Sequence, residues 1–234
     1  WRQWNISCRD AVSRLRFAGR HFRDGAAVKL AGESMDKAPK TLLICCGATA
    51  PEVLAIVKGN GLDHMRVESL PAGLHNTPQF IPERVREKIR ANRDLYARIL
   101  VLYSDCGTGG LLQKVLDEEG VESIAGAHCY EMYAGAAAFA AITDQEIGCF
   151  FLTDYLAQHF DRLVYQGLGL DRHPELRDSY FANYTKVLYL AQRDDPALRA
   201  CAAAAAERLG LELEIRQTGF GHYSDFLNRH AQKP

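Results

Sequence analysis

The sequence predicts an α/β fold of repeated βαβ units with parallel strands. One phrase recurs three times: a buried strand, a short turn, a helix, a second strand, and then a glycine and a histidine. Its copies cover residues 42–75, 99–128 and 187–222. The stretches between the strands carry apolar residues three or four positions apart, which is the helical period. Because such units pair their strands in parallel with right-handed crossovers, they either share one mixed sheet or form pseudo-threefold lobes around a central site.

The first unit starts with a β-rich run over residues 41–46. Its helix begins at Pro51, where the N–H that proline lacks would be unpaired in any case. Gly61 ends this helix, and residues 65–70 return as a strand. Residues 82–100 are amphipathic, so we expect them to form a helix that covers the sheet.

The second and third units repeat this order. In the second unit we expect strands at 99–104 and 121–125 around a helix at 110–119, and then a helical pattern over the partly alanine-rich residues 130–165. A further helix opens at Pro174. In the third unit, Asp195 and Pro196 open a helix that reaches Leu209, between strands at 187–190 and 211–216.

These boundaries predict two parts of the chain. Residues 1–40 contain nine Lys or Arg against four Asp or Glu and are interpreted as a basic N-terminal arm or extension. Residues 41–234 form an α/β metal-binding domain of three βαβ units, which cover 41–98, 99–165 and 186–234.

The composition excludes two classes of partner. A formal net charge of −1 provides no basic field for nucleic acid, and no aromatic-basic stripe is present. The longest apolar run, near residues 133–142, is well short of the roughly 20 residues that span a bilayer. The seven cysteines are an odd number in a chain too large to depend on disulfides, which favours reduced thiols and a cytoplasmic location.

Three cysteines are candidate metal ligands. Cys46, Cys106 and Cys129 each follow a predicted strand and lie in a loop that contains glycine. Ligands gather at the carboxyl ends of parallel strands, so we expect these thiols to converge. The alternative is that they are inert buried cysteines. No CxxC occurs, and the well-separated thiols fit either zinc or an iron-sulfur cluster, between which the sequence does not decide. Cys45 alternates with Cys46 and should face the other side of its strand.

Other polar residues recur beside these thiols. His75, His128 and His222 occupy equivalent positions at the ends of the three units and are candidate ligands, proton-transfer groups or substrate binders. We interpret His128, Glu131 and His222 as catalytic and His75 as cofactor-binding. The alternatives are hydrogen-bonded loop histidines and, for Glu131, a solvated carboxylate in the first turn of a helix.

The run Asp105-Cys-Gly-Thr-Gly-Gly precedes a helix and could leave backbone amides free for an anion. Asp105, Gly107 and Gly109 are therefore candidate cofactor-binding residues. The alternative is that Asp105 caps the amides of its own turn. The run lacks the lysine of a P-loop and the GxGxxG spacing, which disfavours a nucleotide.

Several segments in order resemble a bacterial and archaeal domain of unknown function found beside corrinoid-dependent methyltransferase genes. The resemblance covers about residues 42–189. It is carried by CGA at 46–48, LPAGLHN at 70–76, DCGTGG at 105–110, HCYE at 128–131, FFLTDYL at 150–156 and GLGLDRHPEL at 167–176. The resemblance implies a Cys/His site and a link to one-carbon or methyl metabolism, with a corrinoid, a corrinoid protein or a methyltransferase as partner.

A second resemblance is architectural. Three βαβ lobes with three cysteines outside any CxxC motif look like quinolinate synthase, in which each lobe supplies one thiolate to an iron-sulfur cluster. The present chain departs from that plan, because its third unit offers Asp194 where the first two offer Cys46 and Cys106. Fold analogy alone does not supply a function.

The sequence thus favours a Cys/His metalloprotein that acts on a small molecule. It does not decide whether the protein is an enzyme; a metal-dependent lyase or a methyltransferase would fit. The competing hypotheses are a non-catalytic accessory protein that binds a corrinoid or a methyltransferase, and a small-molecule binding module with structural cysteines.

Overall fold

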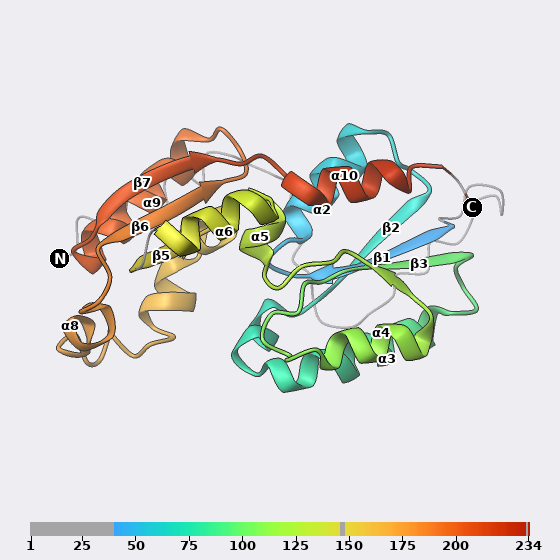
Figure 1. Cartoon of the computed structure of the whole chain (residues 1–234), viewed down its shortest axis with the longest axis horizontal. Coiled ribbons are helices and arrows are strands. Elements are labelled where there is room, and N and C mark those ends of the chain that lie inside the picture. Colours follow the sequence, from blue (N-terminus) through green and yellow to red (C-terminus); the bar gives the residue numbers. More distant parts are fainter. Residues whose placement is uncertain (1–39, 146–147, 233) are drawn as a thin grey trace.

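The computed structural model describes residues 40–145, 148–232 and 234. The predicted basic arm, except for Lys40, lies outside the described residues. The predicted α/β class with parallel strands is confirmed. The strands form two sheets, one of four strands and one of three, that lie in different parts of the molecule (Figure 1).

The four-stranded sheet has the order β2-β1-β3-β4, with all neighbours parallel. Its strands are β1 (Thr41–Cys46), β2 (Met65–Leu70), β3 (Arg98–Leu102) and β4 (Glu122–Ser123). The central strand β1 is buried along its whole length. Such a strand must be apolar on both faces, which explains the continuous run TLLICC.

Helices cover both faces of this sheet (Figure 1). On one face lie α2 (Ala50–Gly59) and α10 (Gly221–Arg229), and on the other α3 (Ile81–Asn92) and α4 (Leu111–Glu119). Two short 3-10 turns, Ala72–Asn76 and Pro78–Phe80, connect β2 to α3.

The faces of β1 separate its two cysteines, as predicted. Cys45 packs in the cluster that contains Val53 of α2 and Phe226 of α10. Cys46 packs on the opposite face, in the cluster that contains Ile81 of α3. The two-residue period of a strand therefore assigns only Cys46 to the side on which Cys106 lies.

The three-stranded sheet has the order β5-β6-β7 and is also parallel. Its strands are β5 (Cys149–Leu152), β6 (Lys186–Ala191) and β7 (Glu212–Gln217). Helices α7 (Asp154–Gln158) and α9 (Pro196–Leu209) contribute to the core on one face, and α6 (Ala136–Gln145) to the core on the other. A π-helical segment, Asp161–Tyr165, and α8 (Leu176–Phe181) complete this part.

Two connections join the sheets. The chain leaves the first sheet through α5 (Cys129–Ala134) and returns to it through α10. The two segments touch closely at Gly221, where φ is +51° and a Cβ would overlap the carbonyl oxygens of Met132 and Tyr133. Only glycine fits this position, so the residue before His222 fixes where the two connections meet.

The arrangement differs from three pseudo-equivalent lobes, because β3 pairs directly with β1 and places the first two units in one sheet. The third unit pairs instead with β5, which lies inside the stretch 130–165 that we predicted to be helical throughout. The four residues Cys149–Leu152 are too short a run for periodicity to separate a strand from a buried helix turn.

No helix in the described part of the chain is both long and apolar enough to cross a bilayer.

Candidate functional site

The carboxyl ends of β1 and β3 bring most of the predicted site residues together. Cys46 is the last residue of β1, and Cys106 follows β3. Beyond β4, the backbone N–H groups of Asp105 and Cys106 donate to the carbonyl oxygens of Gly126 and Ala127, both at 3.0 Å. These two bonds hold the loop that leads directly into His128 and Cys129 beside Cys106.

Gly47 brings His75 to the same place. Its N–H donates to the Leu70 carbonyl at 2.8 Å. A Cβ on Gly47 would lie only 3.0 Å from that oxygen and 3.2 Å from the Ala72 nitrogen. The absence of a side chain therefore lets the turn after β2 approach the end of β1, and His75 Nδ1 lies 3.6 Å from Cys46 Sγ.

His75 links two of the thiols. Contact with Cys106 raises the pKa of His75 above its ordinary value, against the opposing effect of burial. Nδ1 also lies 3.3 Å from the Ala72 carbonyl oxygen. The ring is stacked on Tyr103 with centroids 6.5 Å apart. His75 thus contacts both Cys46 and Cys106 from a loop that carries neither.

His128 and Cys129 form a second pair at the start of α5. His128 is the N-cap residue, and its Nδ1 accepts from the Tyr130 N–H at 3.4 Å. Cys129 Sγ lies 3.6 Å from the same nitrogen. Burial and the neighbouring His75 lower the pKa of His128.

The three thiols are close enough to influence one another. Burial is the main cause that raises the pKa of Cys129 far above its ordinary value, and both Cys106 and Cys46 add to it. Burial also raises the pKa of Cys46. Both groups are therefore neutral thiols at pH 7 in this state, and a bound cation would be needed to convert them to thiolates.

Two tyrosines that the sequence reasoning missed border the thiols. Tyr103 is buried, and among the described residues its hydroxyl has no hydrogen-bond partner of good geometry. The hydroxyl is nevertheless near enough to Cys46 for each group to affect the pKa of the other. Tyr223 is buried in the cluster that contains Cys45; burial raises its pKa, and Cys129, Cys106 and Cys46 are near enough to add to this effect. Tyr103 directly follows β3, so its position at a strand end was a usable signal. Tyr223 had no such signal.

The candidate ligands lie in contact as two pairs, Cys46 with His75 and Cys129 with His128, and they do not surround one common point. Within residues 40–145 and 148–232, no group of three or more His, Cys, Asp or Glu side chains is placed to hold a metal ion. The donor types, three thiols and two imidazoles, are those that zinc and iron-sulfur clusters use. Chemically the set fits a soft metal, and side-chain rotation would have to bring the pairs onto one ion.

The glycine turn after β3 binds its own carboxylate. Asp105 accepts from the Thr108 hydroxyl at 2.5 Å and from the N–H groups of Gly109 and Gly110 at 3.1 and 2.8 Å. Burial acts to raise the pKa of Asp105, but these bonds and the Gly107 N–H outweigh it and lower the pKa. The capping alternative describes this geometry, and an anionic cofactor would have to displace Asp105 from Gly107 and Gly109.

Within the described ranges, neither Glu131 nor His222 forms a hydrogen bond with one of the three thiols. Glu131 Oε2 accepts from the Ala127 N–H at 2.9 Å, which holds the loop before His128. His222 Nε2 lies against Gly135, at the connection between α5 and α6. Among the described residues, no hydrogen bond or ring contact joins His222 to Cys46, Cys106 or Cys129. Asp194 is exposed and pairs with Arg199.

No curated protein and no solved structure matches the chain. One family model does match, over residues 69–227. The match begins after Cys46 but includes His75, Cys106, His128 and Cys129, together with both connections between the sheets. Because it covers more than half of the chain, the protein belongs to the family described as "Protein of unknown function (DUF1638)".

Proposed function

We propose that Cys46, Cys106 and Cys129 bind zinc or an iron-sulfur cluster, with His75 and His128 as further ligands or proton-transfer groups. The observation that supports the proposal is the proximity of three thiols, which come from the end of β1, the turn after β3 and the start of α5. Three neighbouring cysteines gain little from packing alone that alanine would not give, whereas thiolates are strong ligands for soft metals.

The metal would supply Lewis-acid activation of a small polar substrate or a reactive thiolate for methyl transfer. The side chains of the protein would transfer the protons. His75, in contact with two of the thiols, would accept or donate a proton at the site as ligands bind. On this proposal the protein is a cytoplasmic enzyme, either a metal-dependent lyase or a methyltransferase.

Metal analysis tests the proposal. The full chain, purified anaerobically and reconstituted, should contain stoichiometric zinc, or iron with sulfide. The C46S/C106S/C129S variant should lose this metal, because serine is a poor ligand for a soft ion. Bound iron and sulfide would also give a brown protein with visible absorbance, whereas a zinc protein would be colourless.

Cys45→Ala is the matched control. Cys45 belongs to the same strand but faces the α2 and α10 side, so this variant should keep its metal. Absence of stoichiometric metal in the reconstituted wild-type protein would refute the proposal. Equal metal loss in Cys45→Ala would show that metal content follows the integrity of β1 and not the three thiols.

A second candidate function is a corrinoid-binding accessory protein without turnover. Its support is the resemblance of the sequence motifs, and His75 and His128 offer two imidazoles from different loops as ligands toward cobalt. Cobalamin added to the full chain should then change its visible spectrum, and His128→Ala should abolish the change. His173→Ala is the control, since His173 is an exposed residue paired with Glu175. An unchanged spectrum with the wild-type protein would exclude this function.

A further inference from the structure

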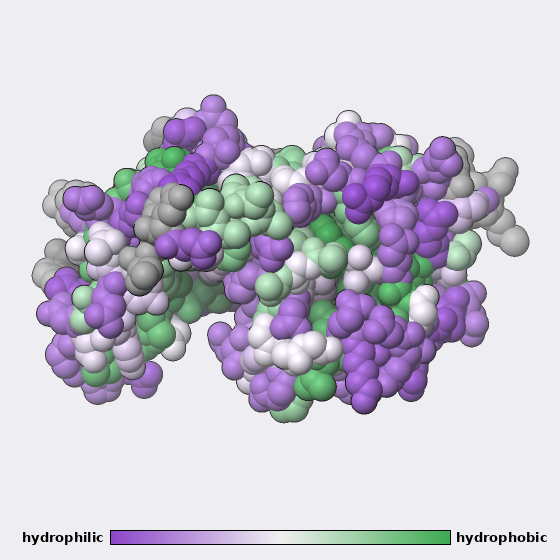
Figure 2. All heavy atoms as spheres, in the orientation of Figure 1, coloured by the Kyte–Doolittle hydropathy of each residue, from purple (hydrophilic) through white to green (hydrophobic). Residues whose placement is uncertain are grey.

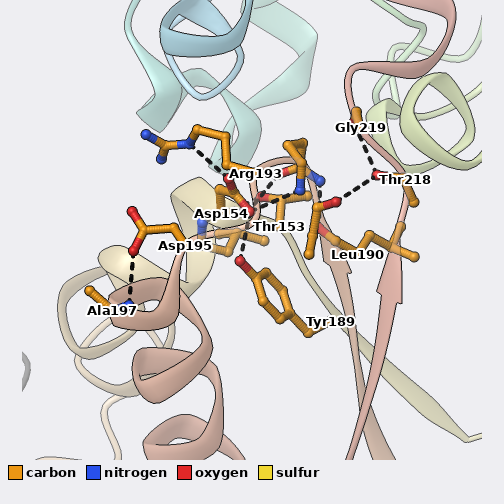
Figure 3. A network of polar contacts seen from close by, with 12 residues as sticks. Thr153, Asp154, Tyr189, Leu190, Arg193, Asp195, Ala197, Thr218 and Gly219 are labelled. Atoms are coloured by element: carbon orange, nitrogen blue, oxygen red, sulfur yellow. Dashed lines mark hydrogen bonds and ion pairs between the residues drawn. The ribbon is translucent and has the colours of Figure 1, made fainter.

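A fully buried carboxylate beside the second sheet, that of Asp154, holds Arg193 in place. Asp154, the first residue of α7, accepts from the Tyr189 hydroxyl at 2.7 Å and from the N–H groups of Gln192 and Arg193 at 3.0 and 3.1 Å. It also accepts from Arg193 Nε at 3.0 Å (Figure 3). These four donors leave the Asp154 carboxylate well satisfied.

Among the described residues, the Arg193 guanidinium is held through one of its three nitrogens. Nε is bonded to Asp154, and the side chain is 42% exposed. Its terminal nitrogens point away from the polar network in Figure 3. In the part of the chain that the structure describes, neither terminal nitrogen has a hydrogen bond or an ion pair. Two NH2 groups are thus held in a defined direction and remain available.

Glu52, on helix α2 beside the first sheet, lies near enough to Arg193 for the two charges to influence each other. It lies in the first turn of α2 and is 2% exposed, and its Oε2 has no hydrogen-bond partner among the residues that the structure describes. We call the region between Glu52 and Arg193 the junction of the two sheets. Asp154 and Arg193 influence the charge of Glu52 from the side of the second sheet. Tyr133 of α5 and Cys45 of β1 interact with it from the side of the first. In the same described ranges, Glu52 and Arg193 do not form an ion pair with each other.

Glu52 is a buried acid that holds its proton up to near-neutral pH. Burial raises the pKa of Glu52 to about 7. Below that pH the carboxyl group is neutral and can donate a hydrogen bond, so the junction presents a fixed cation and a neutral donor. Both groups require an acceptor.

We propose that Arg193 and Glu52 together bind the oxyanion group, a carboxylate or a phosphate, of a small ligand at the junction of the two sheets. A guanidinium with two available nitrogens matches the two oxygens of such a group. Asp154 does not oppose the ligand strongly, because its own charge is already compensated by Arg193 and three further donors. Figure 2 shows an indentation at the lower edge of this face, between the parts built on the two sheets. Of the two residues, Arg193 is the one that solvent reaches, since its side chain is 42% exposed and Glu52 is 2% exposed. The inference does not depend on metal at the cysteines.

Ligand binding tests the proposal with three probes: inorganic phosphate, acetate and succinate. Calorimetric titration of the full chain at about pH 6, below the pKa of Glu52, should detect at least one of them. Arg193→Gln should weaken that binding at least about tenfold, since the fixed cation is lost. Binding of phosphate alone would identify a phosphate ligand, and binding of the carboxylates alone a carboxylate ligand.

Glu52→Gln separates the role of the neutral donor. With acetate or succinate as the probe, wild-type affinity should fall between about pH 6 and pH 8 as Glu52 ionises, whereas the E52Q variant, whose side-chain amide stays neutral, should keep its affinity nearly constant across that range. Arg172→Gln is the matched control, because the Arg172 side chain is 74% exposed and lies in the same part of the molecule. It should bind the probe as the wild type does.

Three results would overturn the proposal: no probe bound by the wild-type protein at about pH 6, unchanged binding in R193Q, or equal loss in R172Q. If R193Q does not fold, Arg193→Lys keeps the charge and should weaken binding severalfold. The C46S/C106S/C129S variant should bind the probe normally, so failure of this proposal and failure of the metal proposal are distinguishable.

Discussion

Replacing Asp154 by alanine should lower the free energy of unfolding by about 3–5 kcal/mol, because several buried donors lose their acceptor and each such loss costs about 1–3 kcal/mol. The substitution removes the acceptor for four donors, two of which are backbone N–H groups of Gln192 and Arg193. The Tyr189 hydroxyl is buried and would also lose its partner. Urea unfolding of the full chain, followed by circular dichroism, measures the effect.

Asp194→Ala provides the matched control for this prediction. Asp194 also pairs with an arginine, Arg199, at 2.8 Å, but its side chain is 81% exposed. Solvent replaces an exposed ion pair readily, so this variant should lose less than about 1 kcal/mol. A loss below about 1 kcal/mol in Asp154→Ala would show that the network around Asp154 does not stabilise the fold.

The sequence predicts the candidate thiol site because the signal for it is local. Cys46 and Cys106 each stand where a buried apolar run gives way to a glycine-containing loop, and parallel strands bring such positions to one edge. The same reasoning placed Cys45 on the other face of β1, as observed. Patterns of period two and the ends of apolar runs are visible in the residues themselves.

The pairing of the strands is harder to predict from the sequence, because periodicity does not indicate which strands are neighbours. Nothing in the phrase repeated three times indicates that β3 pairs with β1 while β6 pairs with β5. The strand β5 is short and follows an alanine-rich helix, so its pattern merges with that of the helix before it. Two sheets and the return of α10 to the first sheet therefore emerge only from tertiary packing.

Glu52 is the clearest residue that local reasoning misses. An acidic side chain in the first turn of a helix ordinarily interacts with the helix dipole at the surface. Here Asp154 and Arg193 from the second sheet approach Glu52, and the Tyr133 hydroxyl of α5 favours its charged form. Its burial depends on the connection between the sheets and on segments far away along the chain.

Replacing Glu52 by glutamine should stabilise the protein at and above neutral pH and leave its stability nearly unchanged below about pH 4.5. Burial raises the pKa of Glu52 from 4.5 to about 7 in the folded protein. The folded state therefore retains the proton that the unfolded state releases as the pH rises from about 4.5 to about 7. The contribution of protonated Glu52 to the free energy of unfolding is fully present below about pH 4.5. It is lost as the pH rises through about 7, and the total loss is roughly 3 kcal/mol.

The measurement is the difference in the free energy of unfolding between E52Q and the wild type, determined from about pH 5 to pH 8.5. Other titrating groups are common to both proteins and cancel in the difference, which should grow in favour of E52Q and level off above about pH 8. Glu87→Gln is the control, since Glu87 is 55% exposed and pairs with Arg84 on the surface of α3. A difference that stays constant with pH would mean that Glu52 ionises in the folded protein as it does in the unfolded chain, and that the junction between the sheets is wetter than its burial indicates.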